Sequence, residues 1–189
     1  MIELFSIPCW QYLFSNFEKN LVILAVENYQ SQKGTNQVSN HRGFQSEKNL
    51  HTVPELFDIF QFICESSRQA ANDLDLKFTN IEIIESWSNV NQGTDSYNHQ
   101  HIHQGVLSGV FYLDAPEGSG NLVIVNPSMN TLWAGYTRIN TRNKYTSEAI
   151  RIQPKDGLLV LWPSYIPHSV ETNTQNIKRI SIAFNIMLS

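Results

Sequence analysis

Three of the six histidines in this chain stand at alternate positions, His99, His101 and His103, in the segment YNHQHIHQGVLSGVFYLD. In an extended segment alternate side chains share one face, so we expect the three imidazoles to point the same way. Neutral imidazole is the commonest protein ligand for iron, zinc, copper and nickel. Two of these histidines, with His168 from a distant strand, would make a facial metal site. The other reading is a surface histidine run without function.

The last apolar segment places a cation and a hydroxyl on one face of a predicted strand. Over residues 179–186 apolar residues alternate with Arg179, Ser181, Ala183 and Asn185. One face is therefore apolar, and the other either meets solvent or lines a polar pocket. His168 stands only eleven residues before Arg179, which favours the pocket. A planar guanidinium in such a pocket suits a carboxylate ligand.

Composition and length are typical of a soluble globular protein. Of 189 residues, 41% are hydrophobic and 16% are charged, and the formal net charge is −4. This length predicts one domain over residues 1–189 that needs no disulfide or structural metal to fold. No block of lysine or arginine occurs, so neither nucleic acid nor an anionic membrane is indicated as a partner. We recognise no transmembrane run or signal peptide, and the two cysteines lack metal-type spacing, so we expect a reducing cytoplasm.

Residues 1–79 carry the helical signal and are predicted to support the remainder of the chain. They begin with an extended segment, a short helix and a long polar loop, expected at residues 4–14, 16–32 and 31–49. Thr52 and Glu55 then form the T-x-x-E pattern of a capping box. Apolar residues recur at helical spacing over residues 56–74, which predicts an amphipathic helix whose apolar face packs on a sheet.

Residues 80–189 read as a series of short strands separated by turn signals. The strands are expected at residues 81–90, 105–113, 121–127, 131–139, 148–154, 157–163, 168–173 and 179–188. Such a series predicts a β-sandwich or jelly roll. The expected fold is therefore mainly β with N-terminal helices, and the amphipathic helix supports a jelly-roll core.

Five segments together carry a family resemblance: HIH, SGVFYLD, GNLVIVNPS, PKDGLLVLWPSYIPHSVETN and KRISIAFNI. They resemble the superfamily of oxygenases that depend on 2-oxoglutarate (2OG) and Fe(II). More narrowly, the chain resembles a 2OG-Fe(II) oxygenase family found in marine bacteria and phages and distantly similar to prolyl 4-hydroxylases. The resemblance extends to LFSIPCWQYLF at the start and is most specific over residues 157–186. It implies a double-stranded β-helix, a cupin-like jelly roll with iron at its open end, in the cytoplasm of a bacterial or phage-infected cell.

The resemblance implies three metal ligands. His101 and His103 match the first metal motif, and His168 matches the distal histidine. The superfamily usually carries Asp or Glu where His103 stands, so the site here would be all histidine. A neutral triad leaves the full charge of a divalent metal to its other ligands, and imidazole also suits zinc, nickel and copper, so the metal's identity stays open. The pair His99 and His101 is an alternative first motif.

The resemblance also implies a site for 2OG. Arg179 matches the arginine that binds the far carboxylate of 2OG, and Ser181 completes the R-x-S pattern. Tyr112 resembles a tyrosine that helps to hold the same carboxylate. Its parity is opposite to that of the motif histidines, so all can face inward only if a turn or bulge intervenes near Gly105; ordinary packing is the other reading. The implied reaction uses Fe(II), 2OG and O₂, hydroxylates an unknown peptide or small molecule, and releases succinate and CO₂.

Two other functions stay open on the sequence alone. GLLVLWPSYIPHSVETN is close to the second cupin motif, which would suit a cupin-like metalloprotein that does not use 2OG. A non-catalytic jelly-roll module for binding or structure is the third reading. Residues 87–98 and 126–148 are the expected lids of the substrate site. Trp87 and Trp162 are read as core or pocket-wall residues. Asn89, Asn98 and Asn185 could donate hydrogen bonds to the metal ligands, but a surface or turn position is the expected reading for each.

Overall fold

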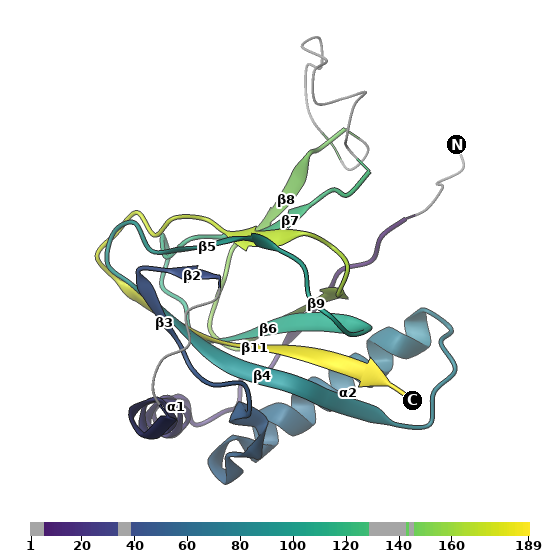
Figure 1. Ribbon diagram of the computed structural model, residues 1–189, viewed down its shortest axis with the longest axis horizontal. Helices are drawn as coiled ribbons and strands as arrows, with labels where there is room; N and C mark the ends of the chain where they lie inside the picture. Colours follow the sequence, from purple (N-terminus) through teal and green to yellow (C-terminus); the bar gives the residue numbers. More distant parts are fainter. Residues whose placement is uncertain (1–5, 34–38, 129–142, 144–145) are drawn as a thin grey trace.

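A computed structural model describes residues 6–33, 39–128, 143 and 146–189 of the chain. Its strands form two antiparallel sheets that lie face to face (Figure 1). The larger sheet has the order β1 (Trp10–Leu13), β9 (Leu158–Pro163), β6 (Leu107–Asp114), β11 (Lys178–Leu188), β4 (Ile81–Gln92) and β3 (Gly43–Gln45). The smaller sheet has the order β2 (Asn40–His41), β5 (Tyr97–His101), β10 (His168–Val170), β7 (Leu122–Val125) and β8 (Ala149–Ile152). The predicted mainly β architecture is confirmed.

Two helices cover the outer face of the larger sheet, α1 (Lys19–Lys33) and α2 (Phe57–Asp73) (Figure 1). Ile59 and Ile63 of α2 are buried in one cluster with Ile182 of β11. The amphipathic helix and its packing on a sheet are thereby confirmed. Burial of apolar area of this kind contributes roughly 25 cal/mol per Å² and is the main force that holds a helix on a sheet.

The start of α2 differs from the predicted capping box. Two short 3₁₀ helices, η1 (Leu50–Thr52) and η2 (Pro54–Leu56), precede the helix, which begins at Phe57 without a side-chain cap. Thr52 lies at the end of η1, where its Oγ1 donates to the carbonyl of Asn49 (2.8 Å). Pro54 is the first residue of η2, so the fixed φ of proline begins a separate turn instead of the first turn of α2.

The stretch predicted as a long loop contains two short strands. β2 pairs with β5, and β3 pairs with β4, so each sheet gains an edge strand from this stretch. Strands of two and three residues are too short for alternation to be recognised, which explains why the polar composition favoured a loop. The strand predicted at residues 131–139, and most of the expected lid at 126–148, lie outside the described residues.

β11 divides the interior into two environments. Ile180, Ile182, Phe184 and Ile186 are buried in the cluster that includes the helices. Arg179, Ser181 and Ala183, on the opposite face, line a pocket between the two sheets. The alternation read from the sequence is confirmed. Because β11 pairs with both β4 and β6, this polar face lies in the middle of the larger sheet.

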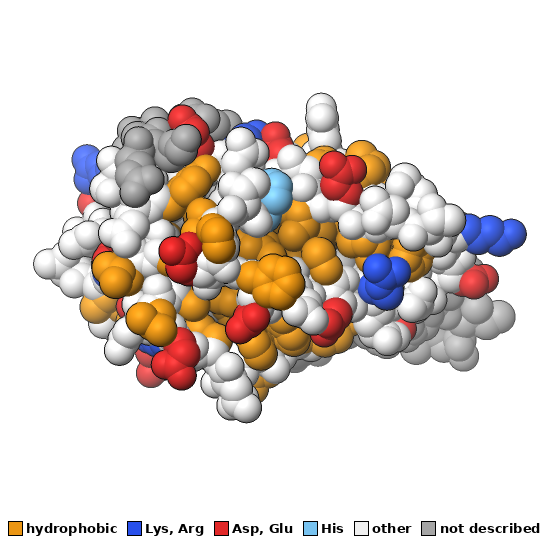
Figure 2. All heavy atoms as spheres, turned by 90° about the horizontal axis from the view of Figure 1, so that it is seen from below, with side chains coloured by type: hydrophobic (Ala, Val, Ile, Leu, Met, Phe, Trp, Pro, Cys, Tyr) orange, Lys and Arg blue, Asp and Glu red, His pale blue; other side chains and the backbone are white. Residues whose placement is uncertain are grey.

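The face that carries the helices is partly apolar (Figure 2). Leu21 and Leu24 of α1 and Phe57 of α2 are all more than half exposed on it. Among the described residues, no helix combines the length and the apolar character needed to cross a membrane.

Replacing Gly105 by alanine should destabilise the protein more than the same change at Gly93. Both glycines have a positive φ, +114° and +80°, which costs an L-residue about 1–2 kcal/mol. At Gly93 a Cβ atom meets nothing closer than 3.7 Å, whereas at Gly105 it would lie 2.8 Å from the carbonyl oxygen of Ile186. Overpacking of this kind costs about 1–3 kcal/mol more. Urea unfolding measures both variants; equal losses would show that the close approach at Gly105 is not a constraint.

Candidate metal centre

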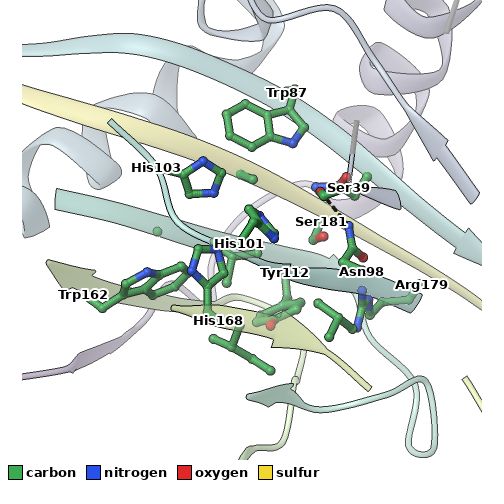
Figure 3. A pocket seen from close by; sticks show the side chains of 16 residues that line it. Ser39, Trp87, Asn98, His101, His103, Tyr112, Trp162, His168, Arg179 and Ser181 are labelled. Atoms are coloured by element: carbon green, nitrogen blue, oxygen red, sulfur yellow. Dashed lines mark hydrogen bonds between the residues drawn. The ribbon is translucent and has the colours of Figure 1, made fainter. Parts of the chain in front are cut away.

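Three imidazoles gather at one end of the pocket between the sheets. His101 ends β5, His103 follows it in the turn to β6, and His168 begins β10. One ring nitrogen from each histidine lies within 4.8 Å of the others. The ring centroids are 4.7 Å apart for His101 and His103, 4.4 Å for His101 and His168, and 5.0 Å for His103 and His168 (Figure 3). Three nitrogen donors at this spacing could hold one metal ion.

A β-bulge in β5 turns His101 toward the pocket. His168 lies opposite His101 and Val170 opposite Asn98, so β5 has one residue more than β10 over this stretch. The extra residue changes which side chains face inward, and both Asn98 and His101 line the pocket. His99 is exposed, and its ring lies 4.8 Å from that of Tyr97. The structure therefore differs from the expectation that all three imidazoles of the motif share a face.

A tight turn places His103 beside the other two rings. Gly105 supplies the positive φ that the turn requires, as the parity of the sequence suggested. The backbone N–H of His103 donates to the carbonyl of Ser164 (3.1 Å). The hydroxyls of Ser164 and Ser108 are hydrogen-bonded (2.8 Å), and Ser108 Oγ also donates to Asn185 Oδ1 (2.8 Å). These buried bonds tie the turn that carries His103 to β6 and β11.

Backbone carbonyls fix the orientation of two of the rings. Nδ1 of His101 lies 2.6 Å from the carbonyl oxygen of His99, and Nδ1 of His168 lies 3.1 Å from that of Ile166. A carbonyl oxygen can only accept, so in each ring Nδ1 carries the proton and Nε2 is left with its lone pair. A metal ligand needs that arrangement, in which the nitrogen away from the metal is held by a hydrogen bond.

Burial keeps the three imidazoles neutral. Burial, with a smaller contribution from the nearby ring of His101, lowers the pKa of His168 to about 3 and that of His103 to about 4. Burial also lowers the pKa of His101. All three are therefore uncharged near pH 7, which is the form that binds metal.

Arg179 forms the other end of the pocket. It is 1% exposed, yet no carboxylate lies within ion-pair distance of it among the described residues. Its Nη1 donates to the carbonyl of Gly120 (2.9 Å) and its Nη2 to Asn91 Oδ1 (2.7 Å), while its Nε has no partner there. Burial lowers its pKa, and the neighbouring Tyr112 opposes that shift. The guanidinium is a buried cation held only by neutral acceptors.

Strand register separates the polar end of the pocket from the histidines. Ser181 of β11 lies opposite Tyr112 of β6 and Asn89 of β4. Two residues along, Ala183 lies opposite Val110 and Trp87 in the same strands. All six of these residues line the pocket. Along β11 from Arg179, a row of mainly polar side chains is therefore followed by a row of apolar side chains. Tyr112 is 1% exposed, and burial raises its pKa to about 12.

Several asparagines expected at the surface are buried instead. Asn89 and Asn98 line the pocket, and Asn185 belongs to the hydrogen-bonded group below the turn of His103. All three are at most 7% exposed, so the expectation of a surface or turn position was wrong. Asn91, which binds Arg179, was not singled out in the sequence; its place two residues after Asn89 in an alternating strand was the available signal. Trp87 and Trp162 line the pocket, as predicted.

The donor set and the available room fit a metal ion. The space enclosed by the pocket-lining side chains is about 40 Å³, which can hold an ion with a few waters.

Two other arginines could in principle bind a carboxylate ligand, Arg138 and Arg151. Arg151 is exposed and pairs with Glu171 (2.6 Å). Arg138 lies outside the described residues. Among the described residues, Arg179 is thus the arginine that the pocket encloses.

Comparison with protein families gives a match over residues 85–185 to the family described as "Putative 2OG-Fe(II) oxygenase". The matched part includes β5 to β10 and most of β4 and β11, and with them every pocket residue discussed above. None of the curated proteins with which the sequence was compared matches it.

Solved structures share the fold at low sequence identity. A prolyl-4-hydroxylase from Pseudomonas putida is 16% identical with a TM-score of 0.62, and the match covers 97% of this chain and 94% of that one. HygX from Streptomyces hygroscopicus, with nickel and 2OG bound, is 12% identical with a TM-score of 0.58, covering 97% and 84%. The epimerase SnoN, in complex with Fe³⁺, α-ketoglutarate and nogalamycin RO, is 10% identical with a TM-score of 0.71, covering 96% and 79%. At these identities the likeness establishes the double-stranded β-helix fold.

The metal-free protein should lose stability as the pH falls from about 6.5 toward about 4. Histidine in an unfolded chain has a pKa of about 6.5, well above the values of about 4 and about 3 for folded His103 and His168. Between these values the unfolded state binds more protons, so protonation favours unfolding by up to about 1.4 kcal/mol per pH unit for each group. The loss levels off below the folded pKa values.

Urea unfolding in the presence of a chelator, from pH 7.5 to pH 4, measures this dependence. His168→Asn should make the slope shallower, whereas His41→Asn, at an exposed position, should leave it unchanged. If His168→Asn kept the slope of the natural protein, His168 would not be held neutral in the folded state.

Proposed function

Since the chain belongs to the 2OG-Fe(II) oxygenase family and is thus a 2OG- and Fe(II)-dependent oxygenase, we propose that it hydroxylates a C–H bond of a peptide or small molecule. The reaction would consume 2OG and O₂ and release succinate and CO₂. We further propose that His101, His103 and His168 hold the metal and that Arg179, Ser181 and Tyr112 bind 2OG.

The observation that carries this proposal is the buried, unpaired guanidinium of Arg179 in the same pocket as three neutral imidazoles. Burying a cation without an anion is costly, so such a site favours a ligand that brings negative charge. A carboxylate matches the planar fork of arginine. The hydroxyl of Ser181 lies on the same strand, β11, and that of Tyr112 lies on the adjacent strand, β6. A dicarboxylic 2-oxo acid has one carboxylate for this end and a chelating group for the metal.

The apolar row between the two ends fits the remainder of that ligand. Val110 and Ala183 lie between the polar row of Ser181 and the end where the imidazoles gather. They would contact the two methylene groups of 2OG, which need no hydrogen-bond partner.

A neutral triad gives this site a distinct electrostatic character. No carboxylate stands among the three candidate ligands, so they leave the charge of a divalent metal uncompensated. An anionic ligand would be attracted at both ends of the pocket, by the metal and by Arg179. When bound, the iron and 2OG supply the oxidative decarboxylation and the oxidation of the substrate. The protein supplies orientation of the ligands and a largely buried cavity that limits access of water.

Arg179→Lys should raise the concentration of 2OG needed for half-saturation at least about tenfold. Lysine keeps the charge but loses the two-pronged contact, and a hydrogen bond to a charged group contributes about 1.5–3 kcal/mol. Anaerobic titration of 2OG into the Fe(II)-loaded protein, followed by the visible band of the chelated 2-oxo acid, measures this affinity. Metal affinity should barely change.

The matched control for this variant is Arg151→Lys, because Arg151 is exposed and paired with Glu171. It should leave the titration unchanged. Equal 2OG affinity for Arg179→Lys and the natural protein would rule out Arg179 as the carboxylate site. A protein that binds Fe(II) but shows no band with 2OG would instead support a cupin-like metalloprotein.

Removing His101 or His103 should weaken metal binding more than about 100-fold, which exceeds the effect of losing an outer contact. His99→Ala should change it less than about tenfold, because the side chain is exposed and only its backbone carbonyl contacts His101. Competition against a coloured chelator, with Co(II) or Zn(II), compares the three variants. If His99→Ala lost the metal and His103→Ala kept it, the first motif would be His99 and His101 instead of His101 and His103.

A further inference from the structure

Trp162 brings a hydrogen-bond donor without an acceptor into the pocket wall. Its side chain is 2% exposed, and Nε1 is buried without a hydrogen-bond partner among the described residues. A buried N–H that has no acceptor is destabilising, and such groups are rare in folded proteins. Phenylalanine would fill the same wall without this cost. The presence of an indole at this position therefore suggests an acceptor that comes from a bound ligand and not from the described residues around it.

The polar groups around Trp162 are engaged with one another. Ser108 lies opposite Trp162 on β6, and its hydroxyl is bonded to Ser164 and Asn185. The carbonyl of Ile166 accepts from His168. Asn89 Oδ1 is a fully buried acceptor of the pocket wall that has no partner among the described residues, but β6 and β11 separate its strand from β9. None of these groups takes the indole N–H.

The indole lies at the end of the pocket where the imidazoles gather. Its ring centroid is 4.7 Å from that of His168, and the two planes are inclined by 59°. Figure 3 shows Trp162 beside His168, while Trp87 lies beside His103 on the other side of the group. An oxygen ligand on a metal held by the three histidines would enter the surroundings of this donor.

We propose that Trp162 is a ligand-binding residue whose Nε1–H donates to an anionic or metal-polarised oxygen at the metal end of the pocket. That oxygen belongs either to the carboxylate of 2OG next to its keto group or to a water on the metal. The proposal rests on the function proposed above, because it needs a metal in the histidine group. It goes beyond that function by assigning a donor to the metal end, where no hydrogen-bond donor has so far been assigned.

The indole proton can be observed directly by nitrogen-15 NMR of the Zn(II)-loaded protein, since zinc is diamagnetic. The chain has four tryptophans, and the spectrum of Trp162→Phe identifies the signal of Trp162. Trp10 provides an internal reference, because its Nε1 donates to a carboxylate oxygen of Asp73 (2.9 Å) outside the pocket. The spectra compare metal-free protein, protein with Zn(II) alone, and protein with Zn(II) and 2OG.

The Trp162 indole proton should move downfield, toward the position typical of a hydrogen-bonded indole, while that of Trp10 stays in place. A shift that appears with Zn(II) alone identifies a metal-bound water as the acceptor, and one that appears only with 2OG identifies the carboxylate. Both results support the proposal. A Trp162 signal that moves in neither spectrum overturns it.

Affinity provides a second readout that separates this proposal from the proposed function. If the carboxylate is the acceptor, Trp162→Phe should weaken 2OG binding to the Zn(II)-loaded protein about tenfold or more, as expected for a hydrogen bond to a charged group. Trp87→Phe, the matched control, should change it less. If the natural protein does not bind 2OG, the proposed function fails, and the Zn(II)-only spectrum still decides the role of Trp162. If it binds 2OG with an unmoved Trp162 signal, only the role of Trp162 fails.

Discussion

The buried charge of Arg179 is the constraint to which the surrounding structure is most closely fitted. Placing a guanidinium at 1% exposure without a carboxylate partner is expensive, because neutral acceptors offset only part of the lost hydration. The fold directs Asn91 of β4 and the carbonyl of Gly120 at its two Nη atoms. These contacts hold the fork in place but do not neutralise it. An anion that enters the pocket would therefore neutralise the guanidinium, which no group of the described residues does. This is the physical basis for proposing a carboxylate ligand.

The two ends of the pocket are kept apart by the register of three neighbouring strands. From Arg179, β11 passes through Ser181 and Ala183, so a polar row and an apolar row precede the histidine end. The histidines come from the opposite side, through β10 and the bulged β5. In the proposed site, the larger sheet would bind the far end of the ligand, and β5, β10 and the segment after β5 would hold the metal. Neither sheet alone contains the site, which explains why ligands for it are separated by many residues in the chain.

The sequence predicted those faces of helices and strands that meet the same environment, core or pocket, along their whole length. It did not predict features that depend on a single inserted residue. The two faces of β11 and the apolar face of α2 followed from periodicity, because each face meets one environment along its length. The bulge beside His99 has no such signature: parity placed His99 with His101, and only pairing with β10 reveals the extra residue. The buried asparagines were missed for a related reason, since asparagine favours turns unless tertiary contacts provide its hydrogen bonds. Thr52 and Glu55 matched a capping pattern, but Pro54 began a separate turn.

The most direct test of the central claim is oxygen-dependent succinate formation. Purified protein is freed of metal, loaded anaerobically with Fe(II) and 2OG, and exposed to O₂, and succinate is measured against samples without metal or with a chelator. Binding of 2OG by Arg179 and the histidine-held metal predicts succinate in the loaded sample alone, formed slowly when no substrate to be hydroxylated is present. Fe(II) bound at the histidine group without any succinate would contradict it.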